Sequence, residues 1–104
     1  MFRAFRSEWY DKKLQKLTKA EQERVSRFEQ HLKLEPYAGK PLGSPFFREK
    51  KFNGKRALFL VYEEQKVIFF ITITDKKVQQ QEIDSIKANL DVYKETIEQL
   101  MKNL

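Results

Sequence analysis

The segment from Phe46 to Lys77 constrains the fold most, because it is typical of a three-stranded antiparallel meander. Asn53-Gly54 is the dipeptide most favoured in a two-residue type I′ hairpin, in which both central residues need a positive φ. A second turn at Glu63 to Lys66 returns the chain into the run VIFFITIT. Basic residues lie before the first turn and after the last strand. We therefore expect cations that are distant in sequence to converge at neighbouring strand positions, and the chemistry to lie there.

The two later strands of the meander, 55–63 and 67–74, are largely apolar on both faces. A strand of this kind is usually central in its sheet and covered on both sides. We therefore expect the N-terminal helices to pack on one face of the sheet and the C-terminal segment to cover part of the other.

The N-terminal third of the chain predicts a short strand and two helices. Phe2 to Arg6 alternates apolar and basic residues, as a short edge strand does. Ser7 can cap a helix that reaches about Leu17. Thr18-Lys-Ala-Glu21 is a capping box that opens a second helix, which Pro36 ends at about Leu34. Because almost no linker separates the two helices, they must fold back on each other as a hairpin.

The segment 36–45 holds all three prolines and two of the three glycines, which predicts an ordered loop between the helical half and the sheet. The last segment, 79–104, predicts a long amphipathic helix, because its apolar residues recur every three or four positions. This stripe consists of Ile83, Ile86, Leu90, Tyr93, Ile97, Leu100 and Leu104. Packing within the molecule is the favoured use of the stripe, and a homodimer through this helix is the open alternative.

With 104 residues, the chain is expected to form a single domain, 1–104. Its net charge of +6 is uneven, because residues 79–104 carry three lysines against five acidic residues and the preceding part holds the excess. A basic body favours an acidic partner, such as nucleic acid or an acidic protein tail. The alternative is a basic protein without such a partner.

The chain contains no cysteine, which excludes a disulfide framework, a thiolate nucleophile and a cysteine-based zinc site. We expect a cytoplasmic location. No apolar run approaches the length of a membrane span, so no membrane association is expected. The N-terminus MFRAFRSEWY lacks the uninterrupted apolar region of a signal peptide.

The order of these predicted elements resembles that of the RelE/ParE superfamily, the toxins of type II toxin–antitoxin systems. The resemblance covers nearly the whole chain. Its matching features are the strand and helix of Phe2–Leu17, the loop Pro36-Tyr-Ala-Gly-Lys-Pro-Leu-Gly43, the aromatic and basic strand Phe46–Phe52, and the Arg56 strand ending in Val61-Tyr62. The tail Asp75-Lys-Lys-Val-Gln79, followed by Glu82-Ile83, Leu90 and Tyr93, is similar to the HigB-like branch.

The resemblance implies an α+β fold with an N-terminal strand and helical hairpin on an antiparallel meander, followed by a C-terminal helix. RelE-like and HigB-like members cleave mRNA on the translating ribosome without a metal or another cofactor, with the RNA 2′-hydroxyl as nucleophile. ParE-like members share the fold and inhibit DNA gyrase. Both kinds are neutralised by an antitoxin that covers the basic surface. The open alternatives are therefore an mRNA endoribonuclease, a gyrase inhibitor without enzymatic activity, and a non-catalytic binding protein of this fold.

Metal-independent RNA cleavage needs cations that stabilise the extra charge on phosphorus. The catalytic candidates are Arg48, Lys50, Arg56, Lys76 and Lys77, and the candidates for RNA binding are Lys40, Lys51, Lys55 and Tyr62. Arg56 is the strongest candidate, because it shares a strand face with Leu58 and Leu60. A cation on such an apolar face indicates a functional role. Several of the lysines have an ordinary alternative role, which is to solvate the exposed side of a hairpin.

Cleavage also needs groups that accept and donate protons. The only histidine, His31, lies in the second helix and is expected to be a helix-surface residue rather than the base. Glu49, Lys76, Lys77 and Tyr62 are the remaining candidates; a lysine acts as a base only where neighbouring cations lower its pKa. The sequence departs from many RelE-like toxins because no Arg or His followed by a terminal Tyr comes after its last strand.

Overall fold

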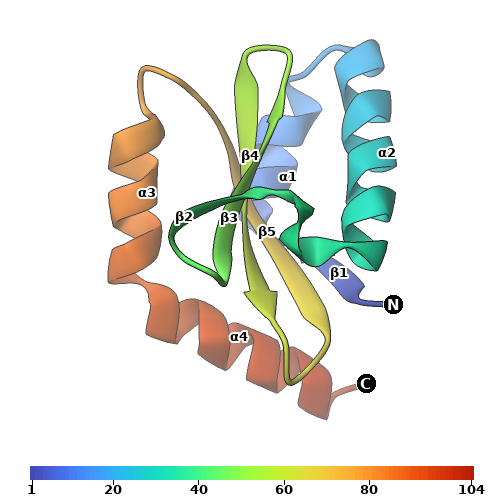
Figure 1. Ribbon diagram of the computed structural model, residues 1–104, viewed down its shortest axis with the longest axis vertical. Helices are drawn as coiled ribbons and strands as arrows, with labels where there is room; N and C mark the ends of the chain where they lie inside the picture. The colour runs from blue at the N-terminus through green and yellow to red at the C-terminus, as the bar shows by residue number, and fades with distance from the viewer.

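The computed structural model describes all 104 residues and places one five-stranded sheet between helices on both faces (Figure 1). The strand order is β1-β5-β4-β3-β2, in which β1 is parallel to β5 and all other neighbours are antiparallel. The predicted α+β architecture is confirmed. The strands are β1 (Arg3–Arg6), β2 (Lys40–Ser44), β3 (Phe47–Phe52), β4 (Lys55–Tyr62) and β5 (Val67–Asp75).

The predicted meander is formed by β3, β4 and β5. Asn53 and Gly54 join β3 to β4 with φ values of 46° and 73°, as a type I′ turn requires. Lys66, with φ 57°, provides the left-handed position of the second turn. The two hairpins fix the register, so that Lys51 lies directly opposite Arg56 and Arg56 lies directly opposite Thr74.

One face of the sheet is covered by α1 (Glu8–Gln15) and α2 (Lys19–Leu34). Both predicted caps are present: the Ser7 hydroxyl accepts from the Tyr10 N–H at 3.0 Å, and Thr18 and Glu21 form the capping box. The two helices fold back on each other, and the Gln22 side chain donates to main-chain carbonyls of α1 and of the turn after it. The helical hairpin is confirmed.

A partly buried ion pair joins this layer to the edge of the sheet. Arg6 of β1 donates to both carboxylate oxygens of Glu29 on α2, at 3.1 and 2.6 Å, and the Tyr10 hydroxyl donates to the same carboxylate at 2.9 Å. Burial and the neighbouring Glu29 raise the pKa of Tyr10 well above its ordinary value. The first three elements of the chain, β1, α1 and α2, therefore meet at one carboxylate.

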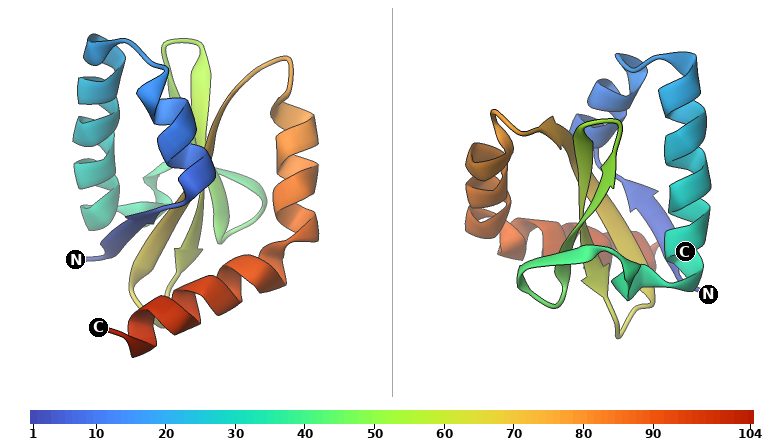
Figure 2. Two further views of the ribbon diagram at one scale, coloured as in Figure 1. Left: turned by 180° about the vertical axis from the view of Figure 1, so that it is seen from behind. Right: turned by 45° about the horizontal axis from the view of Figure 1, so that its top comes forward.

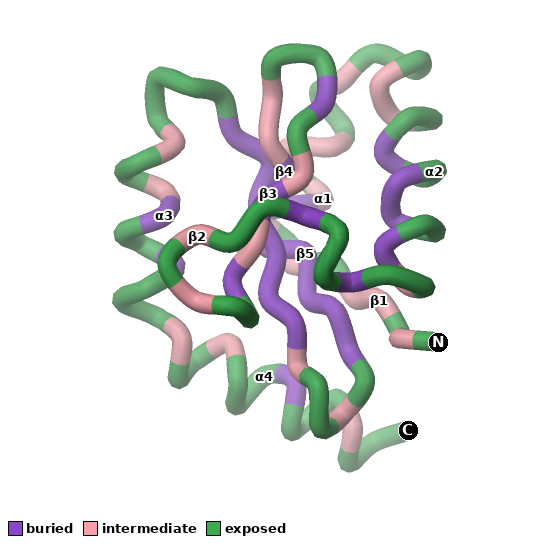
Figure 3. Tube along the Cα trace, in the orientation of Figure 1, coloured by how far each residue is buried: buried purple, intermediate pink, exposed green.

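The opposite face is covered by α3 (Gln79–Ala88) and α4 (Leu90–Lys102), which run in different directions (Figure 2). The predicted helical segment is confirmed, and Asn89 divides it. The Asn89 N–H bonds to Ile86 O, three residues back, and its side chain donates to Ser85 O, so the regular ladder stops there. The stripe packs on the sheet through Ile83, Ile86 and Ile97, which are buried (Figure 3).

The segment predicted as a loop contains a further strand. After a 3-10 turn, η1 (Pro36–Ala38), the residues of β2 pair with β3 at the edge of the sheet. Prolines in a strand argue against a central position, but an edge strand tolerates them because one side needs no donors. The prediction of an ordered loop over the whole segment was therefore wrong, and Lys40 belongs to the sheet.

Two predictions concern association with a second copy of the chain and with a membrane. Leu100 and Leu104 of the C-terminal stripe are exposed, and a homodimer through the C-terminal helix stays a prediction. No helix in the structure is long and apolar enough to cross a membrane.

Candidate functional site

The cationic candidates on β3 and β4 divide between the two faces of the sheet. Phe52 packs in the core beneath α1 and α2, whereas Phe47 packs in the core beneath α3 and α4. Because side chains alternate along a strand, Arg48 and Lys50 lie on the face of Phe52, and Lys51 lies on the face of Phe47. The candidate residues therefore do not form one site, contrary to the expectation that they converge.

Arg48 has a structural role. Its Nε, NH1 and NH2 donate to the main-chain carbonyls of Gly39, Pro45 and Tyr37 at 2.9, 2.8 and 2.8 Å. The guanidinium also lies 5.3 Å from the centre of the Tyr37 ring. All three nitrogens are thus used to hold η1 and β2 against β3, which leaves little of this group for a phosphate.

Lys55, another candidate, is also engaged within the protein. Its Nζ forms an ion pair with Glu21 of α2 at 2.9 Å, and this contact lowers the pKa of Glu21. The pair fastens the end of the hairpin to the start of α2. Lys55 therefore lies on the α2 side of the sheet, with Lys50.

Arg56 lies on the other face and differs from Arg48 in its bonding. Its Nε lies 3.5 Å from Oε2 of Glu49 and makes no hydrogen bond, and neither terminal nitrogen has a hydrogen-bond partner. The side chain is 17% exposed. Buried polar groups normally have partners, so a guanidinium with unused donors at a protein surface is suited to an external anion.

Glu49 forms an ion pair with Arg56. Its carboxylate is 3% exposed and accepts a hydrogen bond at 2.6 Å from the side chain of Gln79, the first residue of α3. Glu49 therefore ties β3 to the start of α3 and balances part of the charge on Arg56. Because it is so deeply buried, we describe Glu49 as a positioning residue rather than as a proton acceptor.

Further cations surround Arg56 at the hairpin end of the sheet. Lys51 lies directly opposite Arg56, an arrangement of like charges that is unfavourable in a sheet. Lys76 lies two residues beyond Thr74, which is the partner of Arg56 on β5. A groove of about 380 Å³ follows this end of the sheet. It is lined by Arg24, Lys51, Phe52, Asn53, Gly54, Lys55, Arg56 and Lys76, with no acidic residue.

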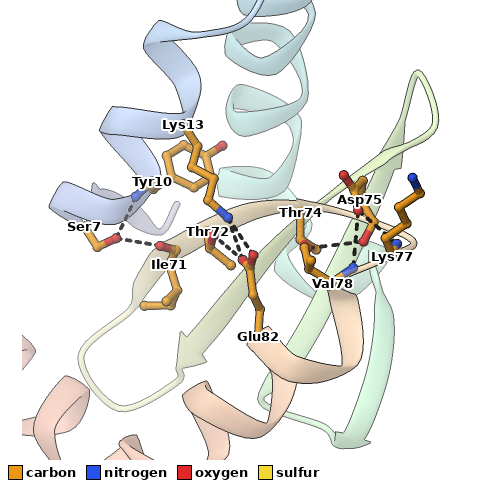
Figure 4. A network of polar contacts seen from close by, with 10 residues as sticks. All are labelled: Ser7, Tyr10, Lys13, Ile71, Thr72, Thr74, Asp75, Lys77, Val78 and Glu82. Atoms are coloured by element: carbon orange, nitrogen blue, oxygen red, sulfur yellow. Dashed lines mark hydrogen bonds and ion pairs between the residues drawn. The ribbon is translucent and has the colours of Figure 1, made fainter.

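The connection from β5 to α3 is fixed by Asp75. One oxygen of its carboxylate accepts from the main-chain N–H groups of Lys77 and Val78 at 2.9 and 3.3 Å (Figure 4). This turn contains Lys76 and Lys77, both exposed, of which Lys76 lines the cationic groove. Lys76 and Arg56 therefore line the same groove.

The sequence did not suggest the network that anchors α3 to the rest of the molecule. Glu82 accepts from Lys13 of α1 at 2.8 and 2.7 Å and from the Thr72 hydroxyl at 2.8 Å (Figure 4). Neighbouring Ser7 donates to Ile71 O at 2.6 Å and so fixes the start of α1 on β5. These contacts hold α3 beside the cationic groove.

Tyr62 lies at the opposite end of β4 from Arg56, so it does not contribute to this groove. Burial raises the pKa of its hydroxyl, which therefore stays protonated and does not act as a base. It lines a separate groove of about 460 Å³ between the sheet and α4, together with Phe46, Leu60, Val61, Glu63, Glu64, Gln65, Leu90, Asp91 and Lys94.

Two remaining candidates lie outside the centre of the groove. Lys40 is exposed on β2, directly opposite Glu49, and so borders the Arg56 face from the edge of the sheet. His31 is exposed on α2 with its Nε2 3.6 Å from the Glu35 carboxylate. The structure has no group of three or more His, Cys, Asp or Glu side chains that could hold a metal ion.

Comparisons with known proteins identify the fold. No protein-family model matches the chain, and no curated protein sequence matches it. The isolated RelE toxin of E. coli superposes with a TM-score of 0.65 at 22% identity, over 83% of this chain and 99% of that chain. A chain of the E. coli RelBE toxin–antitoxin complex superposes with a TM-score of 0.65 at 23% identity, over 72% of this chain and 96% of that chain. A chain of the archaeal RelE–RelB complex from Pyrococcus horikoshii OT3 superposes with a TM-score of 0.64 at 23% identity, over 72% of this chain and 94% of that chain.

Proposed function

We propose that this chain, which has the fold of the RelE toxins, is the toxin of a type II toxin–antitoxin system and cleaves mRNA on the ribosome. The observation that carries the proposal is Arg56. It presents a guanidinium without hydrogen bonds at a groove lined by Lys51 and Lys76 and by no acidic residue. Such a site fits a phosphodiester with the RNA backbone lying along the hairpin end of the sheet.

In the proposed reaction the RNA supplies the nucleophile. The 2′-oxygen loses its proton and bonds to phosphorus, the bond from phosphorus to the 5′-oxygen breaks, and the 5′-oxygen gains a proton. The products are a 2′,3′-cyclic phosphate and a 5′-hydroxyl. The terminal nitrogens of Arg56 bind the non-bridging oxygens in a bidentate manner, where negative charge increases in the transition state.

Proton transfer in this scheme falls to lysines. Lys51 and Lys76 line the groove and form no ion pair within the protein, whereas Lys55 is paired with Glu21. We assign the proton exchange with the 2′- and 5′-oxygens to these two lysines. Lys77, the exposed residue after Lys76, adds positive charge for the neighbouring phosphates.

The same surface supports the proposal of an antitoxin partner. RelE chains of E. coli and P. horikoshii form complexes with RelB antitoxins. For this chain we expect an antitoxin segment with acidic residues, because the surface around Arg56 carries an excess of cations. Covering Arg56 would then block the RNA site.

One observation favours a second candidate, a non-catalytic binding protein of the same fold. The carboxylate nearest to Arg56, that of Glu49, is buried and already bonded to Gln79, so no free carboxylate serves the groove. A cationic groove without an acid–base pair would bind RNA and leave it intact.

The test is inducible expression in cells of the wild type and of Arg56→Ala, with growth recorded and new mRNA 5′ ends mapped. Growth arrest with new 5′ ends within translated regions, both absent in Arg56→Ala, is the expected result. Lys94→Ala is the control, since Lys94 is an exposed cation that lines the separate groove beside α4. Arrest without new 5′ ends would refute the nuclease, and normal growth with soluble wild-type protein would favour the binding role.

A further inference from the structure

A second cationic groove lies on the α2 side of the sheet, and of its residues only Lys51 takes part in the cleavage scheme. It has a volume of about 420 Å³ and runs between α2 and β3. Its lining residues are Arg24, Arg27, Phe28, His31, Lys50, Lys51 and Phe52, so it contains four formal cations, one histidine and no carboxylate. Lys50, which the sequence suggested as catalytic, lies here.

The cations of α2 form a stripe along this groove. Arg24, Arg27 and His31 recur at intervals of three and four residues, so they share one face of the helix. Seven residues of helix extend about 10 Å. Double-stranded nucleic acid carries one charge per ~1.7 Å of axis, so a stripe of this length faces several phosphates.

Few of these cations are neutralised within the protein. Arg24 donates to the neutral amide oxygen of Asn53 at 2.9 Å, and Arg27 and Lys50 form no ion pair or side-chain hydrogen bond. The Glu35 carboxylate, 3.6 Å from His31, is the one acidic contact of the stripe. Most of the positive charge in the groove is therefore available to an external anion.

The aromatic residues of the groove are not available for base stacking. Phe28 and Phe52 are 7% and 3% exposed, and their rings pack against each other with centroids 5.3 Å apart. Sites for single-stranded RNA combine cations with exposed aromatic rings on which unpaired bases stack, whereas double-stranded RNA is bound through its phosphates and its shape. The groove offers cations but no exposed aromatic ring, so it has only the features of a site for double-stranded RNA.

The two cationic grooves adjoin each other. Both are lined by Arg24, Lys51 and Phe52, so positive charge continues around the hairpin end from α2 to Arg56. The groove at the other end of the sheet contains the acidic residues Glu63, Glu64 and Asp91. This polarity would orient an RNA so that its phosphates meet the hairpin end.

We infer that the groove between α2 and β3 binds the phosphate backbone of double-stranded RNA, beside the single strand that Arg56 engages. The choice of RNA over DNA rests on the proposed function, and the choice of a double strand rests on the groove. The α2 groove then anchors a folded RNA while the Arg56 groove holds the strand to be cut.

The experiment measures binding of the purified full-length protein by fluorescence anisotropy. The probes are an RNA duplex of about 16 base pairs, the span of a typical double-stranded RNA domain, a DNA duplex of the same sequence, and one RNA strand alone. The test variant is Arg27→Ala/Lys50→Ala. The matched control, Lys94→Ala/Lys102→Ala, removes the same charge from α4, and circular dichroism verifies that both variants are folded.

The expected result is that the RNA duplex binds at least as tightly as the DNA duplex and more tightly than the single strand. In the test variant, the slope of log affinity against log salt concentration falls by about two, one for each lost phosphate contact, with affinity down about tenfold. The control keeps the wild-type slope. Equal losses in both variants, preference for the single strand or for DNA, or no binding to any probe would overturn the inference. Because no step measures cleavage, a failed nuclease proposal would not alter this result.

Discussion

The Nε of Arg56 lies 3.5 Å from Oε2 of Glu49, and it is the one buried side-chain polar atom in the structure without a hydrogen bond. The carboxylate is bonded on its other side to Gln79 at the start of α3. Arg56 is thus held by charge while its donors stay unused. A guanidinium with unused donors, opposite Lys51 and in the groove that Lys76 lines, is suited to an external anion, which is why we propose that the function of the chain lies there.

Glu49→Gln tests whether this pair is coupled. Removing the carboxylate charge leaves Arg56 beside an uncharged amide, so we expect a loss of about 1–2 kcal/mol in the free energy of unfolding. Replacing Arg56 by Met as well should cost less than the sum of the two single changes, by about 1 kcal/mol. Urea denaturation of the four proteins gives this coupling. Additive losses would show that Glu49 does not hold Arg56.

Arg48→Ala is expected to destabilise the protein without a specific effect on RNA. The change removes three hydrogen bonds to main-chain carbonyls, which should lower the free energy of unfolding by about 2–3 kcal/mol. Lys50→Ala, two residues further along the same strand face and without any ion pair or side-chain hydrogen bond, should cost less than about 0.5 kcal/mol. Thermal and urea denaturation distinguish the two. Equal stability of both variants would contradict the structural role of Arg48.

Gly39→Ala is expected to disturb the approach of β2 to β3. A Cβ at this position would lie 2.6 Å from Glu49 O and 2.9 Å from the Cζ of Phe59, so backbone or core must move, at a cost of about 2–3 kcal/mol. Gly54→Ala meets no atom within 4 Å, but its φ of +73° costs about 1 kcal/mol. Denaturation midpoints should rank wild type, Gly54→Ala and Gly39→Ala in falling order. A Gly39→Ala protein as stable as wild type would refute the tight contact.

Alkaline pH should unfold the protein partly through Tyr10. Burial and Glu29 raise the pKa of Tyr10 in the folded state, so the folded state keeps a proton that the unfolded state loses above about pH 10. The stabilising effect is complete below that pH and is lost as pH rises toward the folded-state pKa. In this window each such tyrosine adds a slope of about 1.4 kcal/mol per pH unit. Tyr10→Phe should therefore show a shallower alkaline loss of stability, measured by urea denaturation at several pH values. An unchanged slope would contradict the buried contact with Glu29.

Much of the fold is predictable from the sequence, because its signals are local. Asn53-Gly54 specifies a turn, Thr18 and Glu21 specify a helix start, and the apolar strands require cover on both faces. β2 was missed because Pro41 and the flanking Gly residues carry loop signals, and only pairing with β3 makes this segment a strand. The change of direction at Asn89 was missed because the apolar stripe continues through it without a gap.

The candidate site was predicted less well, for a physical reason. Arg48, Lys50 and Lys51 are neighbours in sequence, but alternation along β3 sends them to opposite faces of the sheet. The alternation of side chains along the strand would have predicted this division, because Phe47 and Phe52 lie on opposite faces. The sequence does not reveal which guanidinium keeps its donors free. Arg48 donates to the carbonyls of Gly39 and Tyr37, and no local pattern predicts that these carbonyls lie beside it.

The most direct measurement uses purified protein and ribosomes translating a defined mRNA, with cleavage sites and rates read by primer extension. The account predicts cuts by the wild type, a rate at least about 100-fold lower for Arg56→Ala, partial activity for Arg56→Lys, and the wild-type rate for Lys94→Ala. Arg56→Ala cutting at the wild-type rate would contradict the central role of this side chain, and folded wild-type protein that leaves the mRNA intact would contradict the nuclease itself.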